Sequence, residues 1–222
     1  MRPPSSEAEL IERARRLAGQ PLSAIATEVG VPVPGDLRRA KGWIGQLLET
    51  ALGATGSSLP EPDFPGIGVE MKTLPVDERG VPKESTYVCT APMDGSLGSR
   101  WEASWVRRKL SRVLWVPVLS APTLGERRIG QALLWSPEPE EEAILRADWE
   151  EHAATIGLGE LWQLDARRGT ALQIRPKGAD SESTSWTLDD EGEWTRAQAI
   201  GFYLRASFTG AVLAKHFRLP KR

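Results

Sequence analysis

The sequence of 222 residues predicts an α/β protein, because segments with helical periodicity and short apolar segments of strand length follow one another along the chain. Within residues 37–52, apolar residues recur on one helix face: Ile44, Leu47, Leu48, Ala51 and Leu52. Residues 113–118 form an apolar run that is typical of a buried strand. The length allows one large domain or two small lobes with a real core.

The chain up to residue 53 is predicted to be mostly helical. Ser6 and Glu9 have the spacing of a capping box, and the helix that they start ends at Gly19. A second helix, Leu22–Val29, resembles the first helix of a helix-turn-helix unit, but the prolines after it leave no clear recognition helix. We therefore interpret it as a packing helix. The third helix, Leu37–Leu52, carries the apolar face described above.

Beyond residue 53, strands and helices alternate. Apolar and β-branched runs predict strands at Thr86–Ala91, Val113–Val118, Ile129–Trp135, Ala171–Ile174 and around Phe202–Leu204. Helices are expected where Trp101–Ser104 opens a basic segment, where Ser136 and Pro137 start an acidic one, and where Thr209 caps the last one. The polar residues Asp180–Glu193 are predicted to form a surface loop.

Composition limits how this chain can meet nucleic acid. The net charge is −2, so any DNA contact must come from a local basic patch, and the densest one holds Arg107, Arg108, Lys109 and Arg112. The single cysteine, Cys89, excludes a disulfide framework and a cysteine metal site. Neither a signal peptide nor an apolar run of membrane-spanning length is visible, which predicts a cytoplasmic protein without membrane contact.

Residues 62–72 (Pro-Asp-Phe-Pro-Gly-Ile-Gly-Val-Glu-Met-Lys) carry the clearest chemical signal. Glu70 and Lys72 are two residues apart on a short predicted strand, Ile67–Lys72, so their side chains lie on the same face of the strand. Asp63 lies in a turn between two prolines, and we expect this turn to bring it back beside Glu70. Two carboxylates form an oxygen site that suits Mg²⁺, and a lysine beside them can steady a hydroxide or a phosphate. The pattern indicates metal-dependent phosphodiester cleavage.

Simpler interpretations of these charges stay open on the residues alone. Glu70 and Lys72 would also suit a half-buried strand whose two charges form a solvated ion pair. Glu49 lies off the apolar face of its helix, among glycines at positions 42, 45 and 53. The glycines suggest that a strand or a ligand comes close to Glu49, but the position would equally suit an ordinary surface charge.

Longer blocks of sequence resemble one family along nearly the whole chain, the MutH mismatch-repair endonucleases. The blocks are residues 41–45 with 47–49, 63–64 with 68–73, 106–110 with 112–117, 133–137, 173–177 and 201–204. Several blocks in the same order are far more specific than a single tripeptide. The segment 178–201 departs most from the family in length and content.

The resemblance implies a fold, an activity and partners. The fold would be restriction-endonuclease-like, a mixed sheet flanked by helices, with residues 1–222 forming one endonuclease domain whose two lobes enclose DNA in a cleft. The activity would be Mg²⁺-dependent nicking of the unmethylated strand at hemimethylated GATC sites in double-stranded DNA, 5′ to the G, in methyl-directed mismatch repair. MutL would activate the protein, acting with MutS at a mismatch. One site per chain fits a monomer that nicks a single strand.

The resemblance also implies roles for individual residues. Asp63, Glu70 and Glu49 would hold Mg²⁺, Lys72 would be the catalytic lysine, and Lys109 would support catalysis or bind the cleaved phosphate. The residues expected to contact DNA are Lys41, Arg175, Pro176, Lys177 and Tyr203, the last near the adenine whose methylation is sensed. Tyr87 stands where relatives have an aromatic residue, often phenylalanine. The basic patch adds Arg107 and Arg108 as contacts to phosphates.

Two other functions are compatible with these residues. A GATC-specific restriction endonuclease of the same fold would cut both strands, form a stable homodimer and need no MutL. A non-catalytic DNA-binding protein would use the basic patch and the Leu22–Val29 helix. It would bind its site specifically and would not nick it when Mg²⁺ is added.

Overall fold

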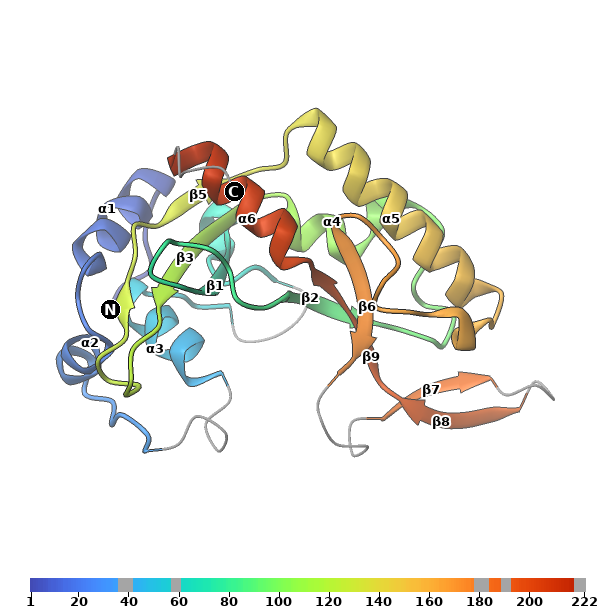
Figure 1. The fold of residues 1–222 in the computed structure, drawn as a ribbon, viewed down its shortest axis with the longest axis horizontal. Helices are drawn as coiled ribbons and strands as arrows, with labels where there is room; N and C mark the ends of the chain where they lie inside the picture. The colour runs from blue at the N-terminus through green and yellow to red at the C-terminus, as the bar shows by residue number, and fades with distance from the viewer. Residues whose placement is uncertain (36–41, 57–60, 178–183, 189–192, 218–222) are drawn as a thin grey trace. The chain divides into compact units, whose positions relative to one another are not determined.

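The computed structural model describes residues 1–35, 42–56, 61–177, 184–188 and 193–217 (Figure 1). The chain divides into two compact units, each built from separate stretches of sequence. Unit 1 comprises Met1–Glu84, Arg112–Ser136 and Gly210–Arg222, and unit 2 comprises Ser85–Ser111 and Pro137–Thr209. The single endonuclease domain with two lobes around DNA stays a prediction. Lys41 and the rest of the predicted helical stretch 37–41 lie outside the described residues.

Unit 1 contains a mixed sheet with β3 at its centre. Its strands are β1 (Glu70–Val76), β3 (Val113–Leu119), β4 (Arg128–Ile129) and β5 (Leu133–Trp135). β1 runs parallel to β3, whereas β4 and β5 pair with β3 antiparallel, each along a different half of it. All of β3 except Leu119 is buried, as expected of a strand with neighbours on both sides and cover on both faces. The predicted α/β class with a mixed sheet is confirmed.

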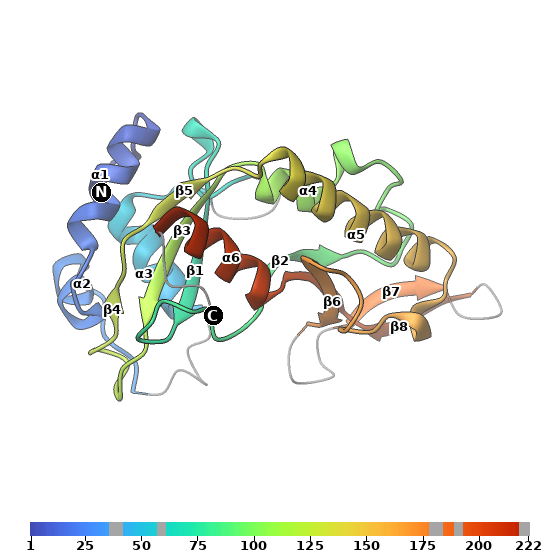
Figure 2. The same ribbon diagram turned by 45° about the horizontal axis from the view of Figure 1, so that its top comes forward.

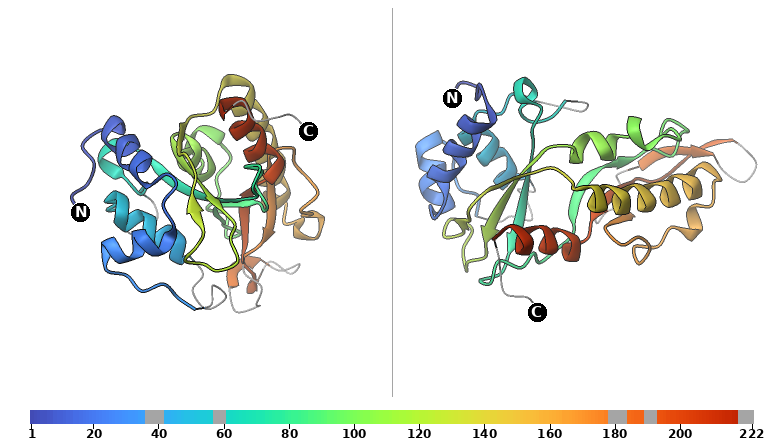
Figure 3. Two further views of the ribbon diagram at one scale, coloured as in Figure 1. Left: turned by 60° about the vertical axis from the view of Figure 1, so that its left-hand side comes forward. Right: turned by 90° about the horizontal axis from the view of Figure 1, so that it is seen from above.

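The helices of unit 1 lie together beside this sheet in every view (Figures 1, 2 and 3). They are α1 (Glu7–Leu17), α2 (Leu22–Val29) and α3 (Trp43–Leu52). Their apolar faces form one core with Leu114, Val116 and Val118, which alternate along β3 and so share one of its faces. Among the described residues, no helix is long and apolar enough to cross a membrane.

Unit 2 contains a second sheet, a hairpin and a long helix. The antiparallel sheet has the order β2 (Thr86–Ala91), β9 (Ile200–Leu204), β6 (Leu172–Pro176), and the hairpin pairs β7 (Thr184–Leu188) with β8 (Trp194–Gln198). The helices are α4 (Trp105–Leu110), α5 (Pro139–Gly157) and α6 (Ala206–Phe217), and α6 continues into unit 1. Short 3₁₀ turns occur at Trp101–Ala103 and Leu161–Gln163. α5 runs as one straight rod in all views of the ribbon (Figures 1 and 3).

Several predicted element boundaries are wrong. The predicted strand Ile129–Trp135 is two strands. Gly130 between them donates its N–H to the Pro117 carbonyl (2.7 Å), but Pro117 has no N–H to return, and the pairing with β3 is shifted by one residue when β5 begins. α5 begins after Glu138 rather than at Ser136, since Pro139 takes the first helical position and the Glu141 carboxylate accepts from the Glu138 N–H at 2.9 Å. Thr209 lies inside α6 and does not cap it.

Two further predictions in polar segments are wrong in part. The predicted surface loop Asp180–Glu193 contains β7, because its threonines and Trp186 suit a strand that pairs with β8. The capping box of α1 is only half formed. Ser6 accepts from the Glu9 N–H at 3.2 Å, but the Glu9 carboxylate accepts from the Ser5 N–H at 2.8 Å and not from Ser6.

A buried carboxylate fixes the loop that leads into β6. Asp148 of α5 is 6% exposed, and its two oxygens accept from the N–H groups of Thr170, Ala171 and Leu172 at 2.6 to 3.0 Å. At the end of β9, Arg205 donates to three carbonyls of the same loop, those of Ala166, Arg168 and Gly169. The loop before β6, the strand that carries Arg175, is therefore held by hydrogen bonds to both Asp148 and Arg205.

Candidate functional site

Glu70 and Lys72 form a buried ion pair at the start of β1. Lys72 Nζ lies 2.8 Å from Glu70 Oε1, and the two side chains are 14% and 5% exposed, respectively. Both belong to one face of the strand because they are two residues apart. This degree of burial does not fit a solvated surface pair, in which each charge would keep its water. The Glu70 N–H donates to the Arg112 carbonyl at 2.9 Å, which ties the start of β1 to β3.

Asp63 returns to β1 through a tight loop. Its Oδ2 accepts from the Met71 N–H at 2.7 Å, so the carboxylate lies at the residue next to Glu70. The loop closes because Pro65–Ile67 forms a 3₁₀ turn, Gly68 takes a left-handed conformation (φ 67°), and Phe64 and Val69 form a bridge. The predicted strand Ile67–Lys72 is therefore shifted: β1 begins only at Glu70 and continues to Val76.

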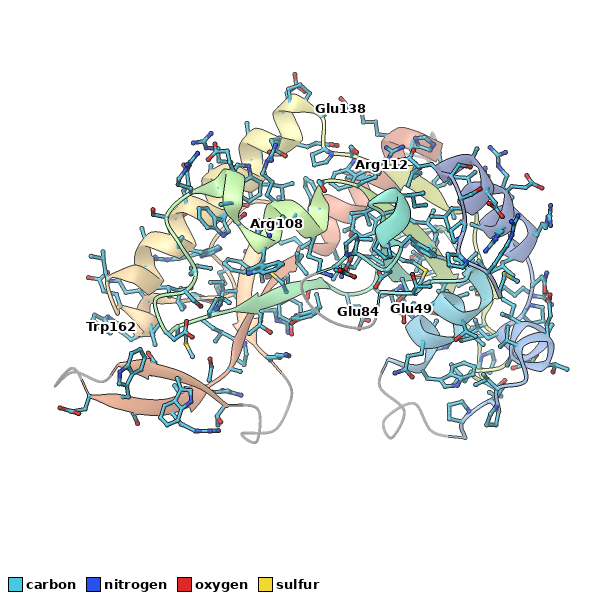
Figure 4. All side chains as sticks on the ribbon, turned by 180° about the vertical axis from the view of Figure 1, so that it is seen from behind. Glu49, Glu84, Arg108, Arg112, Glu138 and Trp162 are labelled. Carbon is cyan, nitrogen blue, oxygen red and sulfur yellow. The ribbon has the colours of Figure 1, made fainter. Side chains whose placement is uncertain are left out.

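Glu49 faces the same carboxylates from α3, where Figure 4 labels it. Its pKa is raised, first by burial and then by the negative charges of Asp63 and Glu70, whereas Lys72 acts to lower it. These four side chains, Glu49, Asp63, Glu70 and Lys72, are called the carboxylate site below. All four belong to unit 1.

The glycines around Glu49 have another role than the one that the sequence suggested. Gly42 and Gly53 are the left-handed residues at the two ends of α3 (φ 85° and 82°). A Cβ at Gly53 would lie 2.5 Å from the Arg2 carbonyl oxygen. Only Gly45 lies beside the carboxylate, and a Cβ there would make an ordinary contact of 3.7 Å with Glu49 Oε1. The glycines therefore mark the ends of α3 and, at Gly53, the close approach of the backbone at Arg2, and not an approach to Glu49.

The carboxylate site has the donor atoms that a hard divalent cation prefers. Its acidic side chains offer only oxygen, and their mutual repulsion is relieved when a cation binds between them. Within the described ranges, no set of three histidine, cysteine, aspartate or glutamate side chains is already grouped as metal ligands. Asp63 is engaged with the Met71 N–H and Glu70 with Lys72. Binding would therefore need rotation of these side chains, with Asp63, Glu70 and Glu49 as the ligands.

Gly56 supports Asp63 and was not identified from the sequence. The N–H groups of Thr55 and Gly56 both donate to the Asp63 carbonyl at 3.0 Å. A Cβ at Gly56 would lie 2.3 Å from the Pro62 carbonyl oxygen and 3.0 Å from Asp63 Cα. Such a clash with backbone cannot be avoided by a side-chain rotation. No sequence pattern distinguishes Gly56 from the other glycines of this loop.

Gly56→Ala is expected to lower the free energy of unfolding by about 1–3 kcal/mol and to displace Asp63 from Met71. The reason is the clash with residues Pro62 and Asp63 described above. Urea unfolding and the ¹H–¹⁵N shift of the Met71 amide measure the two effects. Gly66→Ala is the matched control, because a Cβ at Gly66 meets nothing within 4 Å. Equal behaviour of the two variants would contradict this role of Gly56.

In unit 2, Tyr87 and the predicted DNA contacts Arg175, Pro176, Lys177 and Tyr203 gather on the β2–β9–β6 sheet or at its end. Tyr87 and Tyr203 are paired across β2 and β9, and their rings meet edge to face with centroids 5.3 Å apart. Arg175 lies over the Tyr203 ring at 5.8 Å, and Lys177 lies over the Tyr87 ring at 5.7 Å. These four residues are called the tyrosine face below. Pro176 follows Arg175 at the end of β6 and is exposed.

Polar partners that the sequence did not reveal hold the tyrosine face together. The Thr90 hydroxyl accepts from Lys177 Nζ at 3.1 Å and shares a hydrogen bond of 2.9 Å with the Tyr87 hydroxyl. Arg175 donates to Ser85 Oγ at 2.7 Å. A threonine on β2 and a serine just before it give no signal in the sequence, because only the fold brings them to these cations.

Three residues of the basic patch, Arg107, Arg108 and Lys109, lie on α4 in unit 2, which Ser104 caps by accepting from the Arg107 N–H at 3.1 Å. Arg112 belongs to unit 1 and is paired there with Glu7 at 2.8 Å. Arg107 is paired with Glu142 at 2.8 Å, and Arg108, labelled in Figure 4, stacks over Trp105 at 5.1 Å. Lys109 is 8% exposed. Arg108 is thus an exposed cation available to a phosphate, whereas Arg107 would have to exchange its partner.

Comparison with known proteins identifies the family of this chain. Residues 52–148 match the family model described as DNA mismatch repair enzyme MutH. The DNA mismatch repair protein MutH of Klebsiella pneumoniae is 50% identical over 219 residues, which cover 98% of this chain and 95% of that protein. The proteins of the same name from Serratia proteamaculans (49% identical, 97% and 95% covered) and Salmonella paratyphi C (51% identical, 98% and 95% covered) are similar to the same extent. The chain therefore belongs to the MutH family of DNA mismatch repair enzymes.

Proposed function

We propose that this chain is a Mg²⁺-dependent endonuclease that nicks the unmethylated strand of double-stranded DNA at hemimethylated GATC sites. Membership of the MutH family supports a nuclease of mismatch repair. The single observation that carries the chemistry is the carboxylate site, in which acidic side chains from α3, the Asp63 loop and β1 converge beside a buried lysine. An ion pair that only stabilises a fold does not need several carboxylates placed so close that they repel one another.

The residues of the carboxylate site have distinct tasks in this proposal. Asp63, Glu70 and Glu49 would hold Mg²⁺, which supplies an activated water and neutralises charge at the scissile phosphate and the leaving oxygen. Lys72 is held at 2.8 Å from Glu70, so its ammonium is positioned rather than mobile. It would stabilise the negative charge that grows on the phosphate, and it would orient the attacking water. Lys109 is proposed as a second cation for the cleaved phosphate.

The tyrosine face would read the DNA. Burial raises the pKa of Tyr203, so its hydroxyl stays neutral and can donate a hydrogen bond. A methyl group on adenine N6 changes the pattern that the major groove presents at this position. The DNA backbone beside this adenine would be contacted by Arg175, Lys177 and Pro176. Further contacts to DNA phosphates would come from Lys41, Arg107 and Arg108.

The proposed partners follow from the family and not from a docking surface. MutL would activate nicking, with MutS acting through it at a mismatch. The protein would work as a monomer, because one carboxylate site cuts one strand and a coordinated double-strand cut normally takes two sites related by symmetry.

A nicking assay tests the proposed function. Supercoiled plasmids with unmethylated, hemimethylated or fully methylated GATC sites are incubated with the protein, with and without Mg²⁺ and MutL. We expect open-circular product from the first two plasmids, only with Mg²⁺, and more of it with MutL. Linear product without an open-circular intermediate would indicate a restriction endonuclease, and specific binding without any cleavage would indicate a DNA-binding protein.

Tyr203→Ser is expected to narrow the difference in nicking rate between hemimethylated and fully methylated GATC by about tenfold or more. A lost contact at adenine N6 corresponds to about 1–3 kcal/mol of discrimination. Nicking rates on the two plasmids measure the ratio, and thermal unfolding measures the fold. An unstable variant that keeps the wild-type ratio would show that Tyr203 only supports the sheet.

A further inference from the structure

Gly201 occupies the centre of the sheet face that carries the tyrosines. It is paired with Thr90 on β2 and with Arg175 on β6, and it is two residues before Tyr203 on β9. Residues two apart on a strand share a face, so Gly201 and Tyr203 lie on the same side of the sheet. Thr90, which bonds to Tyr87, and Arg175, which lies over Tyr203, are thus the cross-strand neighbours of Gly201.

The backbone at Gly201 does not require glycine, but the space above it leaves little room for a side chain. Its φ angle is not in the left-handed region, unlike those of Gly42 or Gly68. A Cβ at this position would lie 3.0 Å from Tyr87 Cε2, 3.1 Å from the Cys89 carbonyl oxygen and 3.4 Å from Tyr203 Cε2. A side chain at position 201 would therefore displace the Tyr87 ring by a few tenths of an ångström and would lie in contact with the Tyr203 ring.

The two rings and the two cations form one connected cluster over Gly201. The rings meet edge to face at 65°, the geometry in which the positive edge of one ring faces the negative face of the other. Lys177 over Tyr87 and Arg175 over Tyr203 add a cation to each ring. A displacement of the Tyr87 ring would hence move Tyr203 and would break the Thr90 contacts of Tyr87 and Lys177.

We infer that Gly201 is a positioning residue for base reading: its missing side chain lets Tyr87 and Tyr203 pack together, and the packed pair places the Tyr203 hydroxyl where it distinguishes methylated from unmethylated adenine. This inference rests on the proposed function of the tyrosine face. A base contact depends on the hydroxyl position to within a fraction of an ångström, because hydrogen bonds weaken steeply with distance and angle. Gly201 itself would touch neither the base nor the phosphates.

The first test reads the ring pair without DNA. The chain has two tyrosines, Tyr87 and Tyr203, so ¹³C labelling of tyrosine gives one ring signal set for each. In the wild type we expect cross-relaxation between the two rings and ring-current shifts that depend on both. In Gly201→Ala we expect altered ring-current shifts and a changed cross-relaxation rate between the two rings, while backbone amide shifts of β6 stay in place. Wild-type ring signals in Gly201→Ala would overturn the inference.

The second test reads methylation selectivity. Gly201→Ala is expected to lower the ratio of nicking rates on hemimethylated and fully methylated plasmids by about tenfold, the size of one lost base contact. Gly157→Ala in α5 is the matched control, because a Cβ there meets nothing within 4 Å. The control is expected to keep the wild-type ratio.

A double-mutant cycle separates positioning from a general weakening of the sheet. If Gly201 acts through the Tyr87 ring, Gly201→Ala adds nothing to the selectivity loss of Tyr87→Ala. If the substitution acts only through the Cys89 carbonyl, the two losses add, and the inference is wrong. If the wild type shows no methylation selectivity at all, the proposed function fails, and the ring signals alone decide whether Gly201 positions the pair.

Discussion

Asp63→Ala and Glu70→Gln are each expected to lower the Mg²⁺-dependent nicking rate by at least about 100-fold, the loss typical when a preorganised charge is removed from a reacting centre. Each substitution removes one negative charge from the carboxylate site, and Mg²⁺ then has fewer oxygen ligands. Glu49→Gln is expected to impair nicking severely, and Lys72→Ala to reduce chemistry more than DNA binding. Single-turnover nicking and DNA affinity measured separately distinguish the two kinds of loss.

These substitutions should leave the protein folded. Asp63→Ala removes the acceptor of the Met71 N–H, and leaving this donor unsatisfied corresponds to about 1–3 kcal/mol. Glu70→Gln keeps an acceptor for Lys72 and relieves the repulsion that raises the pKa of Glu49. Glu78→Gln is the control, because Glu78 is an exposed carboxylate in the turn after β1. Wild-type nicking rates in the Asp63 or Glu70 variant would remove the carboxylate site from the mechanism.

Asp148→Ala is expected to destabilise unit 2 by about 3–5 kcal/mol. The substitution leaves the buried N–H groups of Ala171 and Leu172, and the part-buried one of Thr170, without their acceptor, and each unsatisfied buried group contributes about 1–3 kcal/mol before water or relaxation compensates. Asp148→Asn keeps one oxygen and is expected to lose about half as much. Urea unfolding followed by tryptophan fluorescence measures the difference.

Glu150→Gln provides the comparison on the same helix. Glu150 is an exposed carboxylate paired with Arg146 at 2.7 Å and 48% exposed, so its loss should change the free energy of unfolding by less than about 0.5 kcal/mol. A shift in Asp148→Ala no larger than that in Glu150→Gln would mean that the three hydrogen bonds contribute little. Weakened binding of DNA by a folded Asp148→Asn variant would follow from displacement of β6, which carries Arg175 and Lys177.

Local sequence signals predicted those elements that local interactions determine. Leu22–Val29 and Thr86–Ala91 have the predicted bounds, because Gly30 ends the helix in a left-handed conformation and a β-branched run forms the strand. The hairpin β7–β8 was missed, since its polar residues become strands only by pairing with each other. The break at Gly130 depends on Pro117 of β3, which no local pattern contains.

The residues of the candidate site, too, were predicted only where a local pattern in the sequence indicates them. The period of a strand placed Glu70 and Lys72 on one face, and the prolines around Asp63 indicated the turn that brings it back. The glycines near Glu49 were misinterpreted, because helix ends and ligand approach leave the same residue type in the sequence. Gly56, Thr90 and Gly201 could not be found, since each is defined by a neighbour that is distant along the chain or across a sheet.

The strand order in unit 2 has a consequence for synthesis of the chain from its N-terminus. β2 and β6 pair with β9 and not with each other, and β9 is the last of the three to leave the ribosome. Until residue 204 has emerged, β2 and β6 therefore both expose unpaired backbone groups, whereas the sheet of unit 1 can close once residue 135 is available. Unpaired strand edges favour aggregation. Unit 2 is thus the part of the nascent chain most dependent on protection by a chaperone, and a premature stop between residues 177 and 200 should give an insoluble product.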